Sequence, residues 1–137
     1  MPFIIAIFIA AIALLAGCQK LGVGATSTEP AIKFEPTWLP KSAQLVYSSE
    51  DETIKVRARV TEAEFIGVAK TLQLVPYAED KEFGEKMDKL RWNAGPDKLW
   101  NPSPKPEGTL ICHRAILWEL VKYENGFLYY EMFNLDR

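Results

Sequence analysis

The stretch that decides the fold is Leu110–Phe133, LICHRAILWELVKYENGFLYYEMF, near the end of a chain of 137 residues. Two β-rich runs flank the pair Asn125-Gly126. An Asn-Gly pair tolerates positive φ at both central positions of a type I′ turn, so this stretch predicts a β-hairpin in which Trp118 faces Phe133. Apolar side chains fall on both faces of the hairpin. They indicate either a central place in a sheet or one face that meets a ligand.

Two further strands are expected before the hairpin. Gln44–Ser48 is a short candidate, and Thr53–Val60 alternates cleanly between apolar and polar residues. Alternation with a period of two is typical of an antiparallel strand with one exposed face. The exposed face would carry Lys55, Arg57 and Arg59. These cations are either an anion-binding stripe or simply a solvated strand face.

The best helix is expected over Thr61–Leu74. Thr61 and Glu64 have the spacing of a capping box, and apolar residues then recur with helical period. A weaker helix is expected over Asp80–Arg91. Asn93–Gly108 contains four prolines and is predicted to be a loop, either a rigid crossover between helix and sheet or a recognition segment.

The predicted fold class is α+β: a small antiparallel sheet of about four strands, ending in a β-hairpin and packed by one or two helices. Residues 37–137 are expected to form a single globular domain. The formal net charge is −2. This near-balance gives no basic face for nucleic acid and no polybasic patch for anionic lipid.

The N-terminal Phe3–Gly17 is an uncharged apolar run. It is shorter than the ~20 residues that a membrane-spanning helix needs, and it is typical of the apolar region of a secretory signal. The run leads into Leu15-Ala16-Gly17-Cys18, which resembles the lipobox of bacterial lipoproteins. Unlike most of that family, the chain has no Lys or Arg before the apolar run. A buried N-terminal helix and an uncleaved membrane anchor are the alternatives.

The resemblance implies that the Cys18 thiol receives a diacylglyceryl group and that a peptidase cuts between Gly17 and Cys18. Residues 1–17 are then a cleaved signal peptide, and residues 18–36 are the lipidated cysteine and a flexible tether. Two or more acyl chains hold a protein stably on a membrane. Gln19, where an Asp would favour retention in the inner membrane, implies the inner leaflet of the outer membrane if the host is Gram-negative. The expected location is the extracytoplasmic side of the cell envelope.

Residues with catalytic or metal-binding chemistry are sparse. Cys112 has no internal disulfide partner once Cys18 is acylated, so it is either a small buried apolar residue or a reactive or intermolecular thiol. His113 is the single histidine. Glu119 and Glu131 interrupt apolar strands, and a pair of carboxylates could cleave a glycosidic bond, but the pattern selects no pair. We therefore expect no enzyme activity, no catalytic residues, no metal and no cofactor.

The leading hypothesis is a membrane-anchored envelope lipoprotein that acts as a non-catalytic interaction or structural module. Its expected partners are the membrane, through the Cys18 lipid, and an envelope protein or glycan, with no nucleic acid. The alternative is a small-ligand or glycan-binding lipoprotein, including one with weak cell-wall hydrolase activity. Exposed aromatic rings would favour binding, whereas buried ones would be core. The candidate binding residues are Trp92, Trp100, Trp118, Tyr129, Tyr130 and Phe133.

Overall fold

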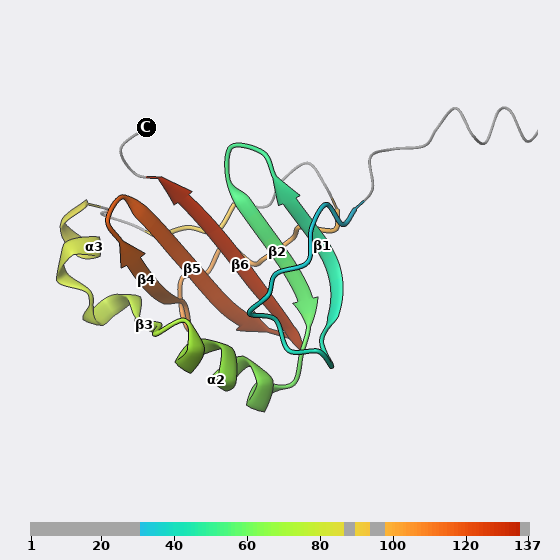
Figure 1. Ribbon diagram of the computed structural model, residues 1–137. Helices are drawn as coiled ribbons and strands as arrows, with labels where there is room; N and C mark the ends of the chain where they lie inside the picture. The colour runs from blue at the N-terminus through green and yellow to red at the C-terminus, as the bar shows by residue number, and fades with distance from the viewer. Residues whose placement is uncertain (1–30, 87–89, 94–97, 135–137) are drawn as a thin grey trace, which may run out of the picture. The chain divides into compact units, whose positions relative to one another are not determined.

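Six strands form a single antiparallel sheet in the order β1-β2-β6-β5-β4-β3 (Figure 1). The computed structural model describes residues 31–86, 90–93 and 98–134. The predicted lipobox and Cys18 lie outside this part of the chain. The strands are β1 (Gln44–Glu50), β2 (Ile54–Arg59), β3 (Val75–Pro76), β4 (Leu110–Arg114), β5 (Leu117–Glu124) and β6 (Phe127–Asn134).

The β5–β6 hairpin is confirmed in both its turn and its register. Asn125 and Gly126 have φ values of 53° and 82°, as a type I′ turn requires. Trp118 lies opposite Phe133 as predicted. The central position is also confirmed, because β6 pairs with β5 on one side and with β2 on the other.

The mixed α and β architecture with one antiparallel sheet is confirmed, but the predicted number of about four strands is wrong. The run expected as one strand before the Asn-Gly turn folds back at Ala115–Ile116 and becomes β4 and β5. Ala115 makes this turn with a φ of 55°. No Gly or Asn marks it in the sequence, so the turn signal was missing. The two-residue β3, paired to Leu110 and Ile111 of β4, adds the sixth strand.

The main helix is α2 (Glu62–Thr71), and its predicted capping box is confirmed. The Thr61 hydroxyl accepts a hydrogen bond from the Glu64 amide, and the Glu64 carboxylate accepts one from the Thr61 amide. A single 3-10 turn, η1 (Tyr77–Glu79), precedes α3 (Lys81–Lys86). The helix predicted over Asp80–Arg91 is present as Lys81–Lys86, and residues 87–89 lie outside the described chain. Leu90 and Arg91 are not helical, so the predicted end of this helix is wrong. Within the described ranges, no helix has the length and apolar character to cross a membrane.

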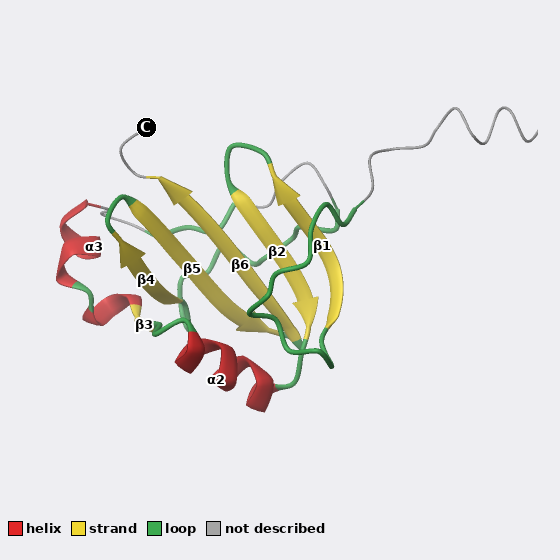
Figure 2. Cartoon of the chain, viewed as in Figure 1, coloured by secondary structure: helices red, strands yellow, loops and turns green. Residues whose placement is uncertain are grey.

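Both faces of the sheet are covered. On the first face, α2 and the segment that precedes β1 pack against Val56, Val121 and Leu128. This segment passes in front of the sheet in Figure 2. On the second face, α3 and the Pro-rich loop pack against Trp118 and Leu120. The protein thus has two small cores that share one sheet, as strands with two apolar faces demand.

The chain is hydrogen-bonded to the sheet from Ala31 onward, and Ala31–Arg137 form one compact unit. The Ser48 amide donates to the carbonyl of Ala31 (2.9 Å), and the Lys33 amide donates to the carbonyl of Ser48 (3.2 Å). The buried Ser48 hydroxyl also accepts from the Lys33 and Phe34 amides, at 2.9 and 3.1 Å. The N-terminal segment is thus hydrogen-bonded to the outer edge of β1, where it covers part of an otherwise open strand edge.

Two glycine substitutions should have opposite effects on stability. Gly126→Ala places an L side chain at a φ of 82° and should lower the free energy of unfolding by about 1 kcal/mol. Gly67→Ala lies in the exposed interior of α2, where a methyl group meets no atom within 4 Å. It should raise the free energy of unfolding by up to about 1 kcal/mol. Urea denaturation measures both, and equal effects of the two changes would contradict the turn geometry.

Candidate functional site

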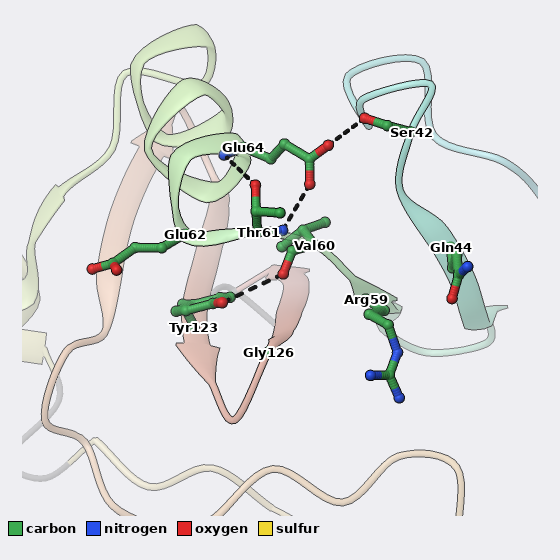
Figure 3. A pocket seen from close by; sticks show the side chains of 9 residues that line it. All are labelled: Ser42, Gln44, Arg59, Val60, Thr61, Glu62, Glu64, Tyr123 and Gly126. Carbon is green, nitrogen blue, oxygen red and sulfur yellow. Dashed lines mark hydrogen bonds between the residues drawn. The ribbon is translucent and has the colours of Figure 1, made fainter.

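An open pocket of about 610 Å³ lies where α2 begins, at one end of the sheet (Figure 3). Three parts of the chain build it: the segment before β1, the β2–α2 junction and the β5–β6 hairpin. Its walls carry hydroxyl, amide, carboxylate and guanidinium groups around one aromatic ring. The lining residues are Ser42, Gln44, Arg59, Val60, Thr61, Glu62, Glu64, Tyr123 and Gly126.

Glu64 joins the upper walls of the pocket. One of its carboxylate oxygens accepts from the Thr61 amide at 2.7 Å, and the other accepts from the Ser42 hydroxyl. These bonds, with Ser42 contributing most, hold the pKa of Glu64 below its usual range. The carboxylate is therefore ionised at neutral pH, and both of its oxygens are used to fix the segment before β1 to the start of α2.

Tyr123 forms the opposite wall. Its ring stacks against Phe65 of α2, with centroids 5.3 Å apart, and its hydroxyl donates to the carbonyl of Val60 at 3.4 Å. The Val60 amide donates in turn to the carbonyl of Gly126 at 3.1 Å. The hairpin turn and the β2–α2 junction therefore hold each other in place, so this wall is built before any ligand arrives.

Two charged side chains of the pocket remain available. Arg59 and Glu62 are both exposed, and neither forms an ion pair with another residue in the described part of the chain. Figure 3 shows them on opposite sides of the pocket. Gln44 lies directly opposite Arg59 across the β1–β2 pair, so an amide and a guanidinium are neighbours. The pocket can donate hydrogen bonds at one side and accept them at the other.

The aromatic residues proposed as binding residues lie elsewhere, and most are buried. Four of them share the core on the second face, where Trp118 is 1% exposed and Tyr129 is 4% exposed. Tyr130 is buried in the core of the first face, and Phe133 is half-buried. The structure thus brings Trp92, Trp100, Trp118 and Tyr129 together as core residues, which is one of the two interpretations that the sequence left open. Binding through these rings stays a prediction, and it requires a conformation that exposes them.

The polar atoms of these rings are bonded inside the protein. The Trp92 indole nitrogen donates to the Thr109 hydroxyl at 2.9 Å, and that of Trp100 donates to the carbonyl of Asn93 at 3.1 Å. The Tyr129 hydroxyl contacts the Asn101 side-chain oxygen at 3.3 Å. Each bond ties the Pro-rich loop to itself or to the sheet. Because buried indole and phenol groups need partners, these bonds are the expected signature of core aromatics.

Lys122 is the residue whose role the sequence analysis missed. Its side chain is buried on the same face of β5 as Trp118 and Leu120, and its ammonium donates to the carbonyls of Ser103 and Lys105 at 2.7 and 3.3 Å. Burial lowers the pKa of Lys122, while the nearby Glu124 acts in the opposite direction. A lysine at a strand position that faces the core could have indicated this role, because a buried charge needs a partner.

The Ser103 hydroxyl lies 3.1 Å from this ammonium, a spacing compatible with a nucleophile and its base. The ammonium donates to two backbone carbonyls, however, and needs its protons for those bonds. The Ser103 hydroxyl donates to Glu124, which also accepts from the Ser103 amide at 3.0 Å. Ser103, Lys122 and Glu124 therefore act together as a clamp that holds the Pro-rich loop on the sheet.

The two strand carboxylates do not form a pair. Glu119 faces the first side of the sheet, where it accepts from the Tyr130 hydroxyl at 2.7 Å. Glu131 faces the second side, opposite Lys55, and burial raises the pKa of Glu131. Side chains on opposite faces of a sheet cannot act on one glycosidic bond. Cys112 is a free thiol and is half-buried, not buried as the apolar reading expected.

Comparison with known protein families, curated proteins and solved structures gives no significant match to this chain. Among the described residues, no group of His, Cys, Asp and Glu is arranged to hold a metal ion.

Removing the buried cation should release the Pro-rich loop. Lys122→Met keeps the unbranched side chain up to the ε position but leaves the carbonyls of Ser103 and Lys105 without their donor, and should lower the free energy of unfolding by about 2 kcal/mol. Limited proteolysis should then cut within residues 98–109. Lys105→Met, which removes the same charge from an exposed position, is the control. Equal stability of the two variants would rule out the clamp.

Proposed function

We propose that the protein is a membrane-anchored envelope lipoprotein whose domain acts as a non-catalytic interaction or structural module. The apolar run and the lipobox Leu15–Cys18 support the anchor. By the same sequence criteria the domain lies on the extracytoplasmic side, at the inner leaflet of the outer membrane if the host is Gram-negative.

The observation that carries the proposal is that the segment after the tether also forms a wall of the pocket. Ala31 and Lys33 are hydrogen-bonded to Ser48 of β1, and Ser42 is bonded to Glu64 of α2. The chain therefore joins the sheet at Ser48 and then continues to Ser42, which lines the pocket at the other end of β1. A domain tethered to a membrane is confined near it, which raises the effective concentration of a partner in the envelope at the pocket.

The use of the carboxylates supports a non-catalytic role. Both oxygens of Glu64 are occupied by structural hydrogen bonds, which leaves Glu62 as the available carboxylate among the lining residues. A glycosidase of the usual kind needs two free carboxyl groups on either side of the scissile bond. The pocket offers hydrogen bonds and charge rather than an acid–base pair.

The same pocket also favours the alternative, a small-ligand or glycan-binding lipoprotein. Gln44, Thr61 and the two free charges offer donors and acceptors beside the Tyr123 ring. A few converging polar groups around an aromatic wall are typical of small-ligand sites. In this alternative a glycan occupies the pocket where the leading proposal places a protein partner.

The anchor is tested by metabolic labelling with a clickable palmitate analogue. Cys18→Ser should abolish labelling and release the protein from the membrane fraction, because the acylated thiol is lost. Cys112→Ser removes the other cysteine and should keep full labelling. Labelling that survives in Cys18→Ser, or is lost in both variants, would overturn the anchor.

The interaction module is tested by site-specific photo-crosslinking in intact membranes. A photoreactive residue at Glu62, in the pocket, should capture one envelope protein in high yield, whereas the same probe at Lys70 should capture none, since Lys70 is exposed on α2 outside the pocket. Equal capture at both positions would contradict a specific interface. Capture of glycan instead of protein at Glu62 would favour the alternative.

A further inference from the structure

Two arginines of β2 gather on one aromatic ring. Arg57 and Arg59 point to the second face of the sheet, and their guanidinium carbons lie 4.0 and 4.8 Å from the centroid of the Phe127 ring. Phe127 is the residue opposite Arg59 in the β2–β6 register. Both guanidinium groups therefore contact the same ring at the start of β6, and each gains a cation–π contact there.

The charge of this pair is not balanced inside the described protein. Lys55, the third cation of the same face, lies opposite the carboxyl group of Glu131. Neither Arg57 nor Arg59 forms an ion pair with any residue that the structure describes. Two unpaired cations on one ring repel each other, although the chain as a whole carries a net charge of −2. A general excess of basic residues therefore does not explain the pair.

The two guanidinium groups are held differently. Arg57 is fixed, because its Nη1 donates to the carbonyl of Leu99 at 3.0 Å and its guanidinium also lies 5.5 Å from the Tyr129 ring. Its Nε is buried and has no acceptor among the described residues. Arg59 is exposed, lines the open pocket and has the Gln44 amide beside it. One preorganised cation thus stands next to one accessible cation with a neutral donor at its side.

We propose that Arg57, Arg59 and Gln44 form a binding site for a phosphate group. A planar carboxylate pairs with one guanidinium, whereas a phosphate has three oxygens that can accept from two guanidinium groups at once. A phosphomonoester also carries −1.5 to −2 charges, which matches two cations. The inference goes beyond the proposed function and does not depend on Cys18, so it stands or falls separately from the anchor. The phosphate belongs either to a lipid headgroup or to a soluble ligand.

The test is an NMR titration of the full chain in nanodiscs of phosphatidylcholine, with inorganic phosphate as the probe. The Nε–Hε signals of Arg57 and Arg59 should shift and saturate, with a dissociation constant on the order of 1 mM. Arg59→Gln should weaken binding about tenfold or more. Lys70→Gln removes the same charge from exposed α2 and should leave binding unchanged. No saturable shift, or equal weakening in both variants, would overturn the site.

A second arm identifies the source of the phosphate. The same arginine signals are compared in nanodiscs of phosphatidylcholine alone and with phosphatidic acid, whose headgroup is a phosphomonoester, without added phosphate. A shift that depends on phosphatidic acid and is absent in Arg59→Gln assigns the site to a lipid headgroup. Unchanged signals, together with saturable binding of inorganic phosphate, assign it to a soluble ligand.

Discussion

The structure depends on one constraint: the central strands β5 and β6 carry apolar side chains on both faces. A sheet of this kind loses hydrophobic free energy unless each face is covered, so the rest of the chain has to supply two layers. The helix α2 and the segment before β1 supply the first layer. The second contains one short helix and an irregular loop. A loop has no ladder of backbone hydrogen bonds, and it therefore needs side chains to satisfy its carbonyls.

This need explains why the second face is rich in indole rings and contains a buried lysine. Trp92 and Trp100 fill the space under the loop and bond its polar groups, while Lys122 donates to the carbonyls of Ser103 and Lys105. On an open sheet these aromatic residues would form an exposed surface, but here they hold the Pro-rich loop in place. The pocket is polar and lies at the end of the sheet, beside the start of α2.

The sequence predicts local features of this fold well. The Asn125-Gly126 turn, the capping box of Thr61 and Glu64 and the alternation in β2 each depend on residues close in the chain, and each is present. Features that depend on residues far apart in the chain were not predicted from the sequence. The turn at Ala115 lacks any turn-forming residue, and the bonds of Ser48 to the N-terminal segment join residues 14 and 15 positions apart.

The candidate site divides in the same way. The sequence places Arg57 and Arg59 on one face of a strand. Their contact with the Phe127 ring depends on the pairing of β2 with β6, and a hydrophobic pattern alone does not predict that pairing. The burial of Trp92, Trp100 and Trp118 could not be predicted either. An aromatic residue in a strand or loop has the same pattern whether the loop covers the ring or leaves it open.

The bonds at Ser48 have a mechanical consequence. If the chain is anchored at Cys18 as proposed, any pull on the tether reaches the domain first at Ala31 and Lys33. Because this segment runs parallel to β1, a pull along the strand would load the hydrogen bonds around Ser48 in shear rather than opening them one after another. Ser48 is thus the point at which tension enters the domain. Rupture of the hydrogen bonds around Ser48 would free the segment that carries Ser42. Force on the anchor would then alter the shape of the pocket.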